Sequence, residues 1–482
     1  MKLETADPAL WNEDLAPVGE DHRTWDWKSI AALWVGMVVC IPTYTLAGGL
    51  ISSGLSAWQA VGVVLLGNLI VLLPMILTGH AGVKYGLPFP VLLRSAFGPK
   101  GAQIPALARG LVACGWFGIN TWFGGSAIYV ALNILTNGAF KGSPLPILGI
   151  DLAQTVCFLI FWAAHIWFIW KGTESIRWLE QISAPFLIAM GLALLAWAYV
   201  KAGGFGPILS APPTASPEKI GMIAASGLTA MVGFWGTMAL NICDFTRFSK
   251  SQKDQMIGQT IGLPLPMALF AFIGAAVTSA TVVIYGEPIW NPVDLAGRMG
   301  GMGVVLALFV LLVATITTNL AANMVSPAYD ISNLAPSKIS FRMGGYITAG
   351  IGIAIFPWKL MDSAATYIVT WLGGYSALLG PIAGILIADY FLLRKTELNV
   401  PDLFRMKGLY TGTGGWNLAG MAALVIGILP NLPGFLHTVG LATVPPVFDA
   451  IFAWAWFVGF FLSGAAYLAL SALKPQPVPL EA

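Results

Sequence analysis

The stretch Leu33–Leu50, LWVGMVVCIPTYTLAGGL, lies in a long apolar segment that Pro42 interrupts. Proline has no backbone N–H, and its ring clashes with the carbonyl group one turn earlier. The helix is therefore expected to kink or unwind near Val38–Cys40. Carbonyl groups freed at membrane depth are tolerated only where protein, water or an ion satisfies them. The break indicates either a cation site or an ordinary proline kink in which Thr43 or Thr45 satisfies these groups.

The composition is that of a polytopic membrane protein. Of 482 residues, 57% are hydrophobic and 10% are charged, and the mean hydropathy is +0.78; a soluble globular chain carries about 25% charged residues. The net charge of +2 suggests no nucleic-acid partner. The four cysteines lie in or at the end of apolar segments and do not form a disulfide framework.

Twelve apolar stretches predict membrane spans, each of which needs about 20 residues. They lie near residues 29–52, 57–79, 104–136, 148–170, 175–201, 220–243, 259–285, 302–333, 341–358, 364–388, 415–431 and 446–473. The loops are short, and none predicts a soluble domain. The segment 80–100 mixes proline, glycine and basic residues with apolar ones, which predicts a short amphipathic helix at the inner membrane surface.

The basic residues predict the orientation. With the N-terminus inside, 19 of the 24 Lys and Arg residues lie in inner segments and 5 in outer loops. Inner loops of membrane proteins carry the excess of positive charge. The tails 1–28 and 474–482 are therefore expected on the cytoplasmic side of the plasma (inner) membrane.

A second interruption is expected in the sixth stretch, GLTAMVGFWGTMALNICDFTRF, where Gly233 and Gly236 bracket Phe234 and Trp235. Each glycine weakens a helix by about 1 kcal/mol relative to alanine. The first and sixth stretches begin about 191 residues apart, and the third and eighth about 198. Interrupted spans at corresponding positions in two halves indicate an inverted-repeat transporter with its site at the midplane, although no residue-level repeat proves this.

The eighth stretch, LLVATITTNLAANMVSPAY, places Ala314, Thr317 and Thr318 on one helical face. Two hydroxyl groups beside the unwound carbonyl groups of the first stretch would form a five-oxygen cage for a hard cation. Alternatively, both threonines bond back to the carbonyl group one turn earlier. Asn319 and Asn323 form a second polar pair, and Asn323 could face a substrate.

The third stretch contains GLVACGWFGINTWFGGS, residues 110–126. Small residues recur at every fourth position and predict close approach of another helix; they are Gly110, Cys114 and Gly118. On a different face, Trp116 and Asn120 lie one turn apart. A stacking ring above a hydrogen-bonding amide suits a flat polar heterocycle, but the same pair could simply pack and bond to a neighbouring helix.

Polar and charged residues elsewhere suggest structural roles. His165 is expected to be a neutral, hydrogen-bonded core histidine rather than a proton relay. Asp244 and Asp389 end the sixth and tenth stretches beside Arg247 and Arg394, which predicts interfacial ion pairs.

Ordered motifs from about residue 10 to beyond residue 410 resemble the nucleobase–cation symporter-1 family, which includes bacterial hydantoin and allantoin transporters and plant and fungal nucleobase transporters. The motifs are NEDLAPVGEDHRTW, IPTYTLAGGLISSG, FPVLLRSAFG, GWFGINTWFGG, LNICDFTRF, TTNLAANMVSPAYD and GPIAGILIADYFLLR. The resemblance implies an all-α leucine-transporter-type fold that works by alternating access. Inverted five-helix repeats would occupy 29–201 and 220–388, and two accessory helices 415–473.

The resemblance also implies the site. Trp116 and Trp235 would sandwich the substrate ring, and Asn120 and Asn323 would hydrogen-bond to its edge. The sodium site would be formed by the carbonyl groups of Gly36, Val39 and Ala314 and the hydroxyl groups of Thr317 and Thr318. Ile368 would be the outer gate.

Three positions that are expected to contact the substrate depart from the hydantoin branch of the family. Cys40 and Asn120 each stand in place of a glutamine, and Phe234 in place of a glycine. Plant-like members are more similar in the first and third stretches, but carry a glutamate at the position of Asn120. Asn120 has a shorter side chain than glutamine or glutamate, and the Phe234 ring takes up space in the site. Both favour a small nucleobase or an allantoin-like ring as substrate over a hydantoin with a bulky substituent.

The sequence therefore predicts a monomeric symporter, without a cofactor, that imports uracil, cytosine, a purine, allantoin or hydantoin with Na⁺ or H⁺. Proton-coupled transport of another small heterocycle or vitamin, and a transporter-like sensor, are the alternatives. A membrane enzyme is disfavoured because no cluster of catalytic carboxylates, histidines or cysteines lies at one depth. A channel is disfavoured because no acidic or glycine-rich filter is present.

Overall fold

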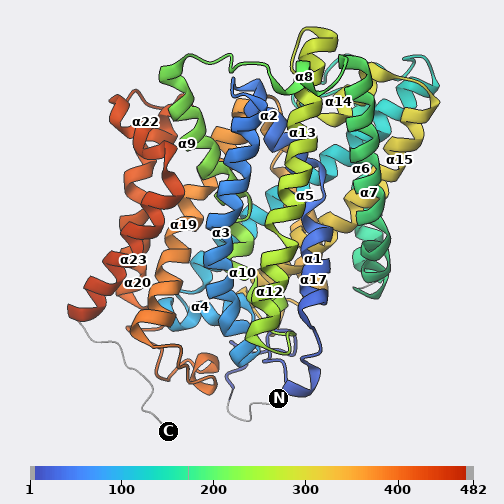
Figure 1. Ribbon diagram of the computed structural model, residues 1–482. Helices are drawn as coiled ribbons and strands as arrows, with labels where there is room; N and C mark the ends of the chain where they lie inside the picture. Colours follow the sequence, from blue (N-terminus) through green and yellow to red (C-terminus); the bar gives the residue numbers. More distant parts are fainter. Residues whose placement is uncertain (1–5, 172, 474–482) are drawn as a thin grey trace.

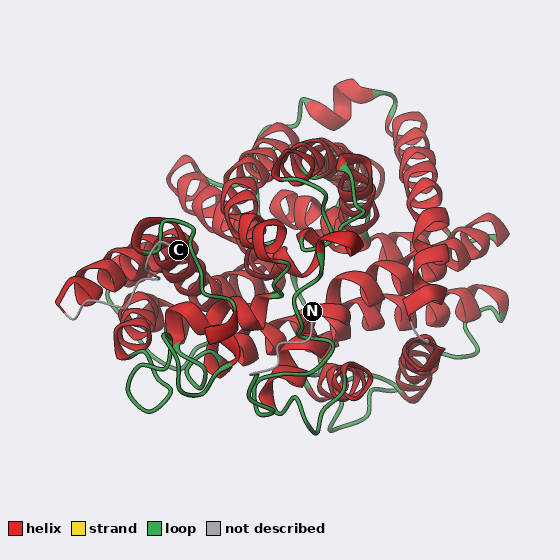
Figure 2. Cartoon of the chain, turned by 90° about the horizontal axis from the view of Figure 1, so that it is seen from below, coloured by secondary structure: helices red, strands yellow, loops and turns green. Residues whose placement is uncertain are grey.

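The computed structural model describes the backbone of residues 6–171 and 173–473; the side chains of 171–187 and of positions 306, 310, 313, 314, 317 and 321 lie outside this description. Helices are the main secondary structure of the described chain, joined by loops (Figure 2), and the first and last described residues lie toward the same end of the bundle (Figure 1). The first half contains η1 (Glu20–His22), α1 (Trp27–Val38), α2 (Ile41–Ser52), α3 (Ala57–Tyr85), α4 (Phe89–Phe97), α5 (Gln103–Leu135), α6 (Leu152–Lys171), α7 (Thr173–Ala202) and α8 (Phe205–Leu209).

The second half begins with an interrupted span. It contains α9 (Pro217–Phe234), α10 (Gly236–Asn241), α11 (Cys243–Thr246), α12 (Gln252–Gly262), α13 (Pro264–Tyr285), α14 (Pro292–Met299), α15 (Met302–Asn323), α16 (Val325–Leu334), α17 (Phe341–Ala354), α18 (Pro357–Leu360), η2 (Thr366–Gly373), α19 (Gly374–Ile387), η3 (Ala388–Leu393), η4 (Pro401–Phe404), α20 (Leu418–Ile428), η5 (Leu429–Asn431), α21 (Leu432–Thr438), α22 (Pro446–Ala453) and α23 (Ala455–Leu473).

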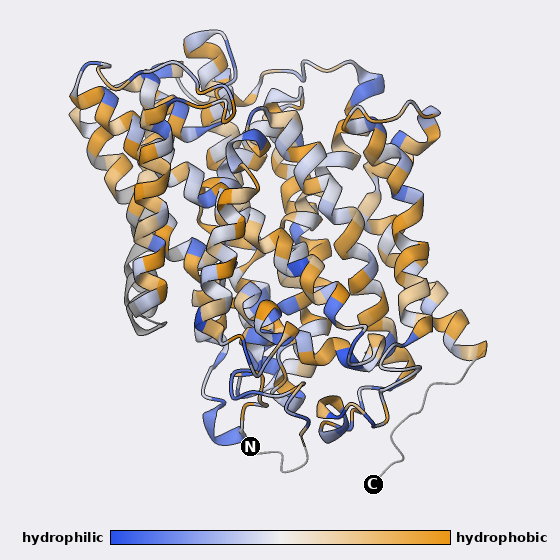
Figure 3. Cartoon of the chain, turned by 180° about the vertical axis from the view of Figure 1, so that it is seen from behind, coloured by the Kyte–Doolittle hydropathy of each residue, from blue (hydrophilic) through white to orange (hydrophobic). Residues whose placement is uncertain are grey.

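Apolar residues predominate along most of the length of the helices (Figure 3), and some of them are exposed on the outside of the bundle. On α3, for example, Leu66, Leu69 and Leu73 are all more than half exposed. Within the described residues, six helical spans are long and apolar enough to cross a membrane, and the bent pair α1–α2 makes a seventh. The number of twelve spans stays a prediction, because several predicted stretches are divided into shorter helices.

The break at Pro42 is confirmed. Helix α1 ends at Val38, Cys40 is extended with φ −146° and ψ 163°, and α2 starts at Ile41. The two helix axes differ by 54°. The hydroxyl group of Thr43 donates to the carbonyl oxygen of Val38 at 2.8 Å, so the proline-kink interpretation is correct for that carbonyl group.

The second predicted interruption is confirmed too. Helix α9 ends at Phe234, Trp235 has φ −95° and ψ 8°, and α10 begins at Gly236. Sequence pattern had not predicted a third interruption, at Met324 between α15 and α16. Three interrupted spans thus place irregular backbone near the centre of the bundle.

The small-residue face of α5 packs against another helix, as predicted. A Cβ atom on Gly118 would overlap the carbonyl oxygen of Gly352 on α17. Gly110 faces Asp330 on α16, where a Cβ atom would lie 3.3 Å from the aspartate Cβ. Backbone contact at Gly118 therefore fixes the position of the helix that carries Trp116 and Asn120.

The expectation of a surface-lying helix in the segment 80–100 is wrong in one respect. A helix does form, as α4, but all nine of its residues are buried. The loop before α20 covers it: Asn417 donates from its backbone to Phe97 O at 2.9 Å and from its side chain to Ala96 O at 2.8 Å. The segment is therefore part of the protein interior.

Candidate functional site

A small central cavity lies where the interrupted spans meet. Its volume is about 30 Å³, which is close to the share of liquid volume of one water molecule. It is lined by Met37, Cys40, Pro42, Trp116, Asn120, Phe234, Trp235, Thr237, Met238, Thr318, Ala322 and Asn323. This set includes all six residues predicted to contact the substrate, which come from α5, α9, α15 and the two breaks.

Three aromatic rings close this cavity. Trp116 and Phe234 meet edge-to-face with ring centroids 5.0 Å apart, and Phe234 and Trp235 meet in the same way at 5.0 Å. Phe234 therefore contacts both tryptophans that were predicted to sandwich a substrate ring.

Each tryptophan is held by a hydrogen bond from its indole N–H. Trp116 Nε1 donates to Tyr375 Oη at 3.2 Å, and Trp235 Nε1 donates to Asn68 Oδ1 at 3.1 Å. Trp34 packs edge-on against Trp235 with centroids 5.1 Å apart. Sequence reasoning missed these supporting residues, because they lie on other helices and share no local pattern with the tryptophans.

The two asparagines that line the cavity have defined amide orientations. Asn120 Nδ2 donates to the carbonyl oxygen of Trp116 at 3.1 Å. Asn323 Nδ2 donates to Asn319 Oδ1 at 3.0 Å. Each bond uses one of the two N–H donors of the NH₂ group, so each amide keeps one N–H donor and its acceptor oxygen.

A chain of hydrogen bonds fixes the orientation of Asn323. Asn319 Nδ2 donates to the carbonyl oxygen of Phe117 at 3.0 Å, and a carbonyl group can only accept. The same Nδ2 lies 3.1 Å from His165 Nε2, while His165 Nδ1 lies 2.9 Å from Phe161 O. This network assigns the Nδ1–H tautomer of a neutral ring, as expected for a core histidine. Unexpectedly, this histidine is linked to the cavity.

The predicted cation site is described in part. Thr318 Oγ1 donates to the carbonyl oxygen of Gly36 at 3.3 Å, which joins α15 to α1 beside the cavity. Val39 is buried at the break. The side chains of Ala314 and Thr317 lie outside the described residues, so their part in the cage stays a prediction.

The predicted gate residue, Ile368, is not among the residues that line the central cavity. It is 3% exposed and lies in η2. A Cβ atom on Gly49 of α2 would lie 2.9 Å from its Cδ1 atom. The side chain thus packs between η2 and α2, and its role as a gate stays a prediction.

The predicted ion pairs at the inner end are half correct. Arg394 Nε lies 2.9 Å from Asp389 Oδ2, and both side chains are buried. Asp244, in contrast, accepts from the backbone N–H of Phe89 at 2.7 Å and from Asn241 Nδ2 at 3.2 Å. Asp244 therefore holds the start of α4, and its predicted pairing with Arg247 is wrong.

A fully buried ion pair was not predicted. Arg109 Nη1 on α5 lies 3.1 Å from Asp330 Oδ2 on α16, and neither side chain is exposed. Arg109 Nε and Nη2 and the Asp330 Oδ1 atom have no hydrogen-bond partner in the described chain. The two charges lie in separate predicted spans, so the sequence alone gives no signal that they meet.

Comparison with known proteins gives the class to which this site belongs. Residues 17–459 match the family described as permeases for cytosine/purines, uracil, thiamine and allantoin. The chain is 46% identical over 465 residues to the purine-uracil permease NCS1 of Arabidopsis thaliana, covering 96% of this chain and 78% of the relative. It is 42% identical over 470 residues to the allantoin permease of Bacillus subtilis (strain 168), covering 97% and 94%.

A solved structure agrees with these matches. The structure of Mhp1, a nucleobase-cation-symport-1 family transporter with bromovinylhydantoin bound, superimposes with a TM-score of 0.76 at 25% identity over 97% of each chain. The fold and site thus define a multi-pass membrane transporter with leucine-transporter-type structural neighbours, not an enzyme. The chain belongs to the nucleobase–cation symporter-1 family of permeases.

Proposed function

We propose that this permease is a symporter that imports one small lactam ring together with Na⁺ by alternating access. In this proposal the chain is a monomer with twelve spans, arranged as two inverted five-helix repeats and two accessory helices. Both termini are cytoplasmic, at the plasma (inner) membrane. The observation that carries the substrate class, a flat heterocycle with a donor next to an acceptor, is the presence of the amides of Asn120 and Asn323 beside the tryptophans in one cavity.

Each amide keeps an acceptor oxygen and one N–H donor, which suits a ring edge that carries a donor next to an acceptor. Uracil, hypoxanthine, allantoin and hydantoin carry a ring N–H next to a carbonyl group. Cytosine and adenine carry an amino group next to an unprotonated ring nitrogen and can meet the same two groups, so the choice of a lactam ring rests on the named relatives. The relatives named for purine and uracil and for allantoin transport support this class.

Binding requires the central cavity to open. With Phe234 packed against both tryptophans, a cavity of about 30 Å³ is too small for a six-membered ring. Phe234 ends α9, next to the break at Trp235, where the backbone is not held in a continuous helix. We therefore place the movement that admits the substrate at this break.

Sodium is favoured as the coupled ion by the oxygen atoms beside the cavity. Thr318 Oγ1 and Gly36 O lie 3.3 Å apart, and uncharged carbonyl and hydroxyl oxygens are hard ligands that suit a hard cation. The residues that line the central cavity in the described chain include no aspartate, glutamate or histidine that could carry a coupled proton. Proton coupling stays the alternative.

Radiolabelled uptake into proteoliposomes tests this function. Uracil, hypoxanthine, allantoin, hydantoin, cytosine and adenine are compared with an inward Na⁺ gradient, with an inward pH gradient and with neither. We expect Na⁺-driven accumulation of at least one lactam ring, at a higher level than cytosine or adenine. Accumulation of cytosine or adenine above every lactam ring would refute the lactam assignment, and accumulation driven only by the pH gradient would refute sodium coupling. Binding without accumulation would indicate a sensor.

A further inference from the structure

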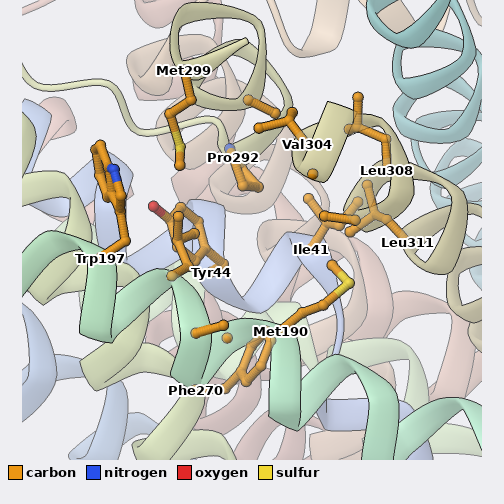
Figure 4. Close-up of a pocket in the computed structure, with 16 residues that line it drawn as sticks. Ile41, Tyr44, Met190, Trp197, Phe270, Pro292, Met299, Val304, Leu308 and Leu311 are labelled. Carbon is orange, nitrogen blue, oxygen red and sulfur yellow. The ribbon is translucent and has the colours of Figure 1, made fainter. Parts of the chain in front are cut away.

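A second, larger cavity of about 260 Å³ lies between α2, α7, α13, α14 and α15. We call it the lateral cavity (Figure 4). Its floor consists of the buried side chains of Ile41, Phe270 and Leu311. It shares no lining residue with the central cavity. An engineered apolar cavity of about 150 Å³ already holds benzene, so the lateral cavity has room for a larger apolar group.

One polar atom stands out among these apolar walls. The hydroxyl group of Tyr44 points into the cavity, between Trp197 and Met299 (Figure 4). Tyr44 is only 3% exposed, and within the described chain its Oη has no partner apart from the neighbouring hydroxyl group of Thr278 on α13, which has no other partner either. When two hydroxyl groups pair, one O–H donates to the other oxygen and the second O–H is left without an acceptor. A buried donor without a partner is unfavourable, so an acceptor supplied by a ligand would stabilise this arrangement.

The lateral cavity is open toward the outer surface of the bundle. Its rim consists of partly exposed residues on α7 and α15, such as Leu194 and Val304. Beside the rim, Val200 on α7 is 73% exposed and Met302 on α15 is 63% exposed. Apolar side chains exposed on a multi-pass membrane protein face lipid. The bilayer therefore has direct access to the cavity.

We propose that the lateral cavity binds one acyl chain of a bilayer lipid, whose ester carbonyl oxygen accepts a hydrogen bond from Tyr44. The hydroxyl group lies beside α14, at the end of the bundle opposite the termini (Figures 1 and 4), where an ester group at the membrane interface can reach it. The acyl chain of the lipid then covers Ile41 and Phe270 on the floor of the lateral cavity.

Other occupants fit the lateral cavity less well. A buried water typically makes about three hydrogen bonds, and the hydroxyl groups of Tyr44 and Thr278 would supply two at most. A charged ligand would find no charged side chain among the lining residues. A protein helix, with a diameter of about 10 Å, is too wide for this volume.

Photo-crosslinking in proteoliposomes tests this proposal without measuring transport. The vesicles contain phosphatidylethanolamine with a photoactivatable diazirine in one acyl chain, and mass spectrometry locates the adducts. We expect adducts to concentrate on the lining peptides of α7 and α15 rather than on the lipid-facing side of α3. Tyr44→Phe keeps the aromatic ring and removes the hydroxyl group that donates to the lipid ester. Labelling of the lining peptides should therefore fall by about two- to tenfold, which corresponds to the free energy of one hydrogen bond.

Two filling variants and one matched control complete the experiment. Ala307→Phe fills the wall and Ala193→Phe fills the mouth, and each should abolish labelling of the lining peptides. Ala196→Phe, on the same helix as Ala193 but outside the cavity, should leave labelling unchanged. Thermal melting confirms that each variant is folded; if Ala307→Phe is not, Ala193→Phe decides the result.

Three results would overturn the proposal: labelling spread evenly over all lipid-facing helices, labelling of the lining peptides that survives both filling variants, or adducts between two copies of the chain in place of lipid adducts. None of these depends on which ring or cation the protein transports.

Discussion

Replacing Thr318 by valine tests the coupling site with little change in side-chain volume. The Oγ1 atom of Thr318 donates to Gly36 O at 3.3 Å, and both oxygens must turn to a bound cation. A contact with a charged group is worth about 1.5–3 kcal/mol, and the neutral hydrogen bond that it replaces about 0.5–1.5 kcal/mol. The difference is about 1–1.5 kcal/mol, so the half-saturating Na⁺ concentration should rise roughly 5- to 12-fold.

The assay is substrate binding followed by the fluorescence of the tryptophans beside the central cavity, titrated with NaCl at constant ionic strength. Thr318→Ser keeps the hydroxyl group and should stay close to the unmodified protein. At saturating Na⁺, Thr318→Val should recover most of its substrate affinity, because the substrate contacts are intact. An unchanged Na⁺ requirement in Thr318→Val, or an equal rise in Thr318→Ser, would show that this hydroxyl group is not a ligand.

Three further predictions concern the ring, the buried ion pair and an exposed one. Trp116→Ala removes a stacking surface worth about 1–3 kcal/mol per base; we expect the Kd for the transported ring to rise about 5- to 150-fold, measured by equilibrium binding, with a smaller loss for Trp116→Phe. Asp330→Leu leaves Arg109 buried and unpaired, which should lower the free energy of unfolding by about 3–5 kcal/mol; adding Arg109→Met should recover most of this in thermal denaturation, and additive losses would contradict the pairing. Lys84 lies 2.6 Å from Glu397 and holds the pKa of that carboxyl group below its ordinary value. The Lys84–Glu397 ion pair therefore stabilises the folded state at pH values above the unfolded-state pKa of Glu397, about 4.3. This stabilisation is lost as the pH falls through the lower folded-state pKa. In melting curves, Glu397→Gln should remove this acid-dependent loss.

The interruptions of the helices could be predicted because their causes are local. Pro42 lacks an N–H, and Gly233 and Gly236 weaken the helix around Trp235, so the sequence itself marks the places where helical bonding fails. The family resemblance then indicated which residues meet at these breaks, and the six predicted substrate-contact residues do line one cavity. Their roles in binding stay predictions.

The supporting contacts could not be predicted because they depend on distant segments. Asn68 on α3 and His165 on α6 reach the site from other helices, and no spacing in the sequence relates them to Trp235 or Asn323. For Asp244, in contrast, closeness in sequence predicted a contact that does not form. Arg247 is close to it in sequence, but the free N–H at the start of α4 is a better-placed partner.

Burial of α4 was mispredicted for a related reason. The mixture of apolar and basic residues in segment 80–100 predicts the helix, but it does not indicate which other segment covers the helix. The covering loop, with Asn417, lies more than three hundred positions later in the chain. A pattern read over twenty residues contains no information on such a partner.

The contact between Gly118 and Gly352 has a consequence for anyone who wishes to change what this permease carries. Helix α5 rests there on backbone, which no alternative rotamer can relax. Phe234, by contrast, lies at the end of a helix next to irregular backbone. Variant libraries aimed at new cargo should therefore sample Phe234 and its neighbours at the α9–α10 break first and leave the glycine face of α5 untouched, since mutations on that face would be lost to misfolding before selection could act on specificity.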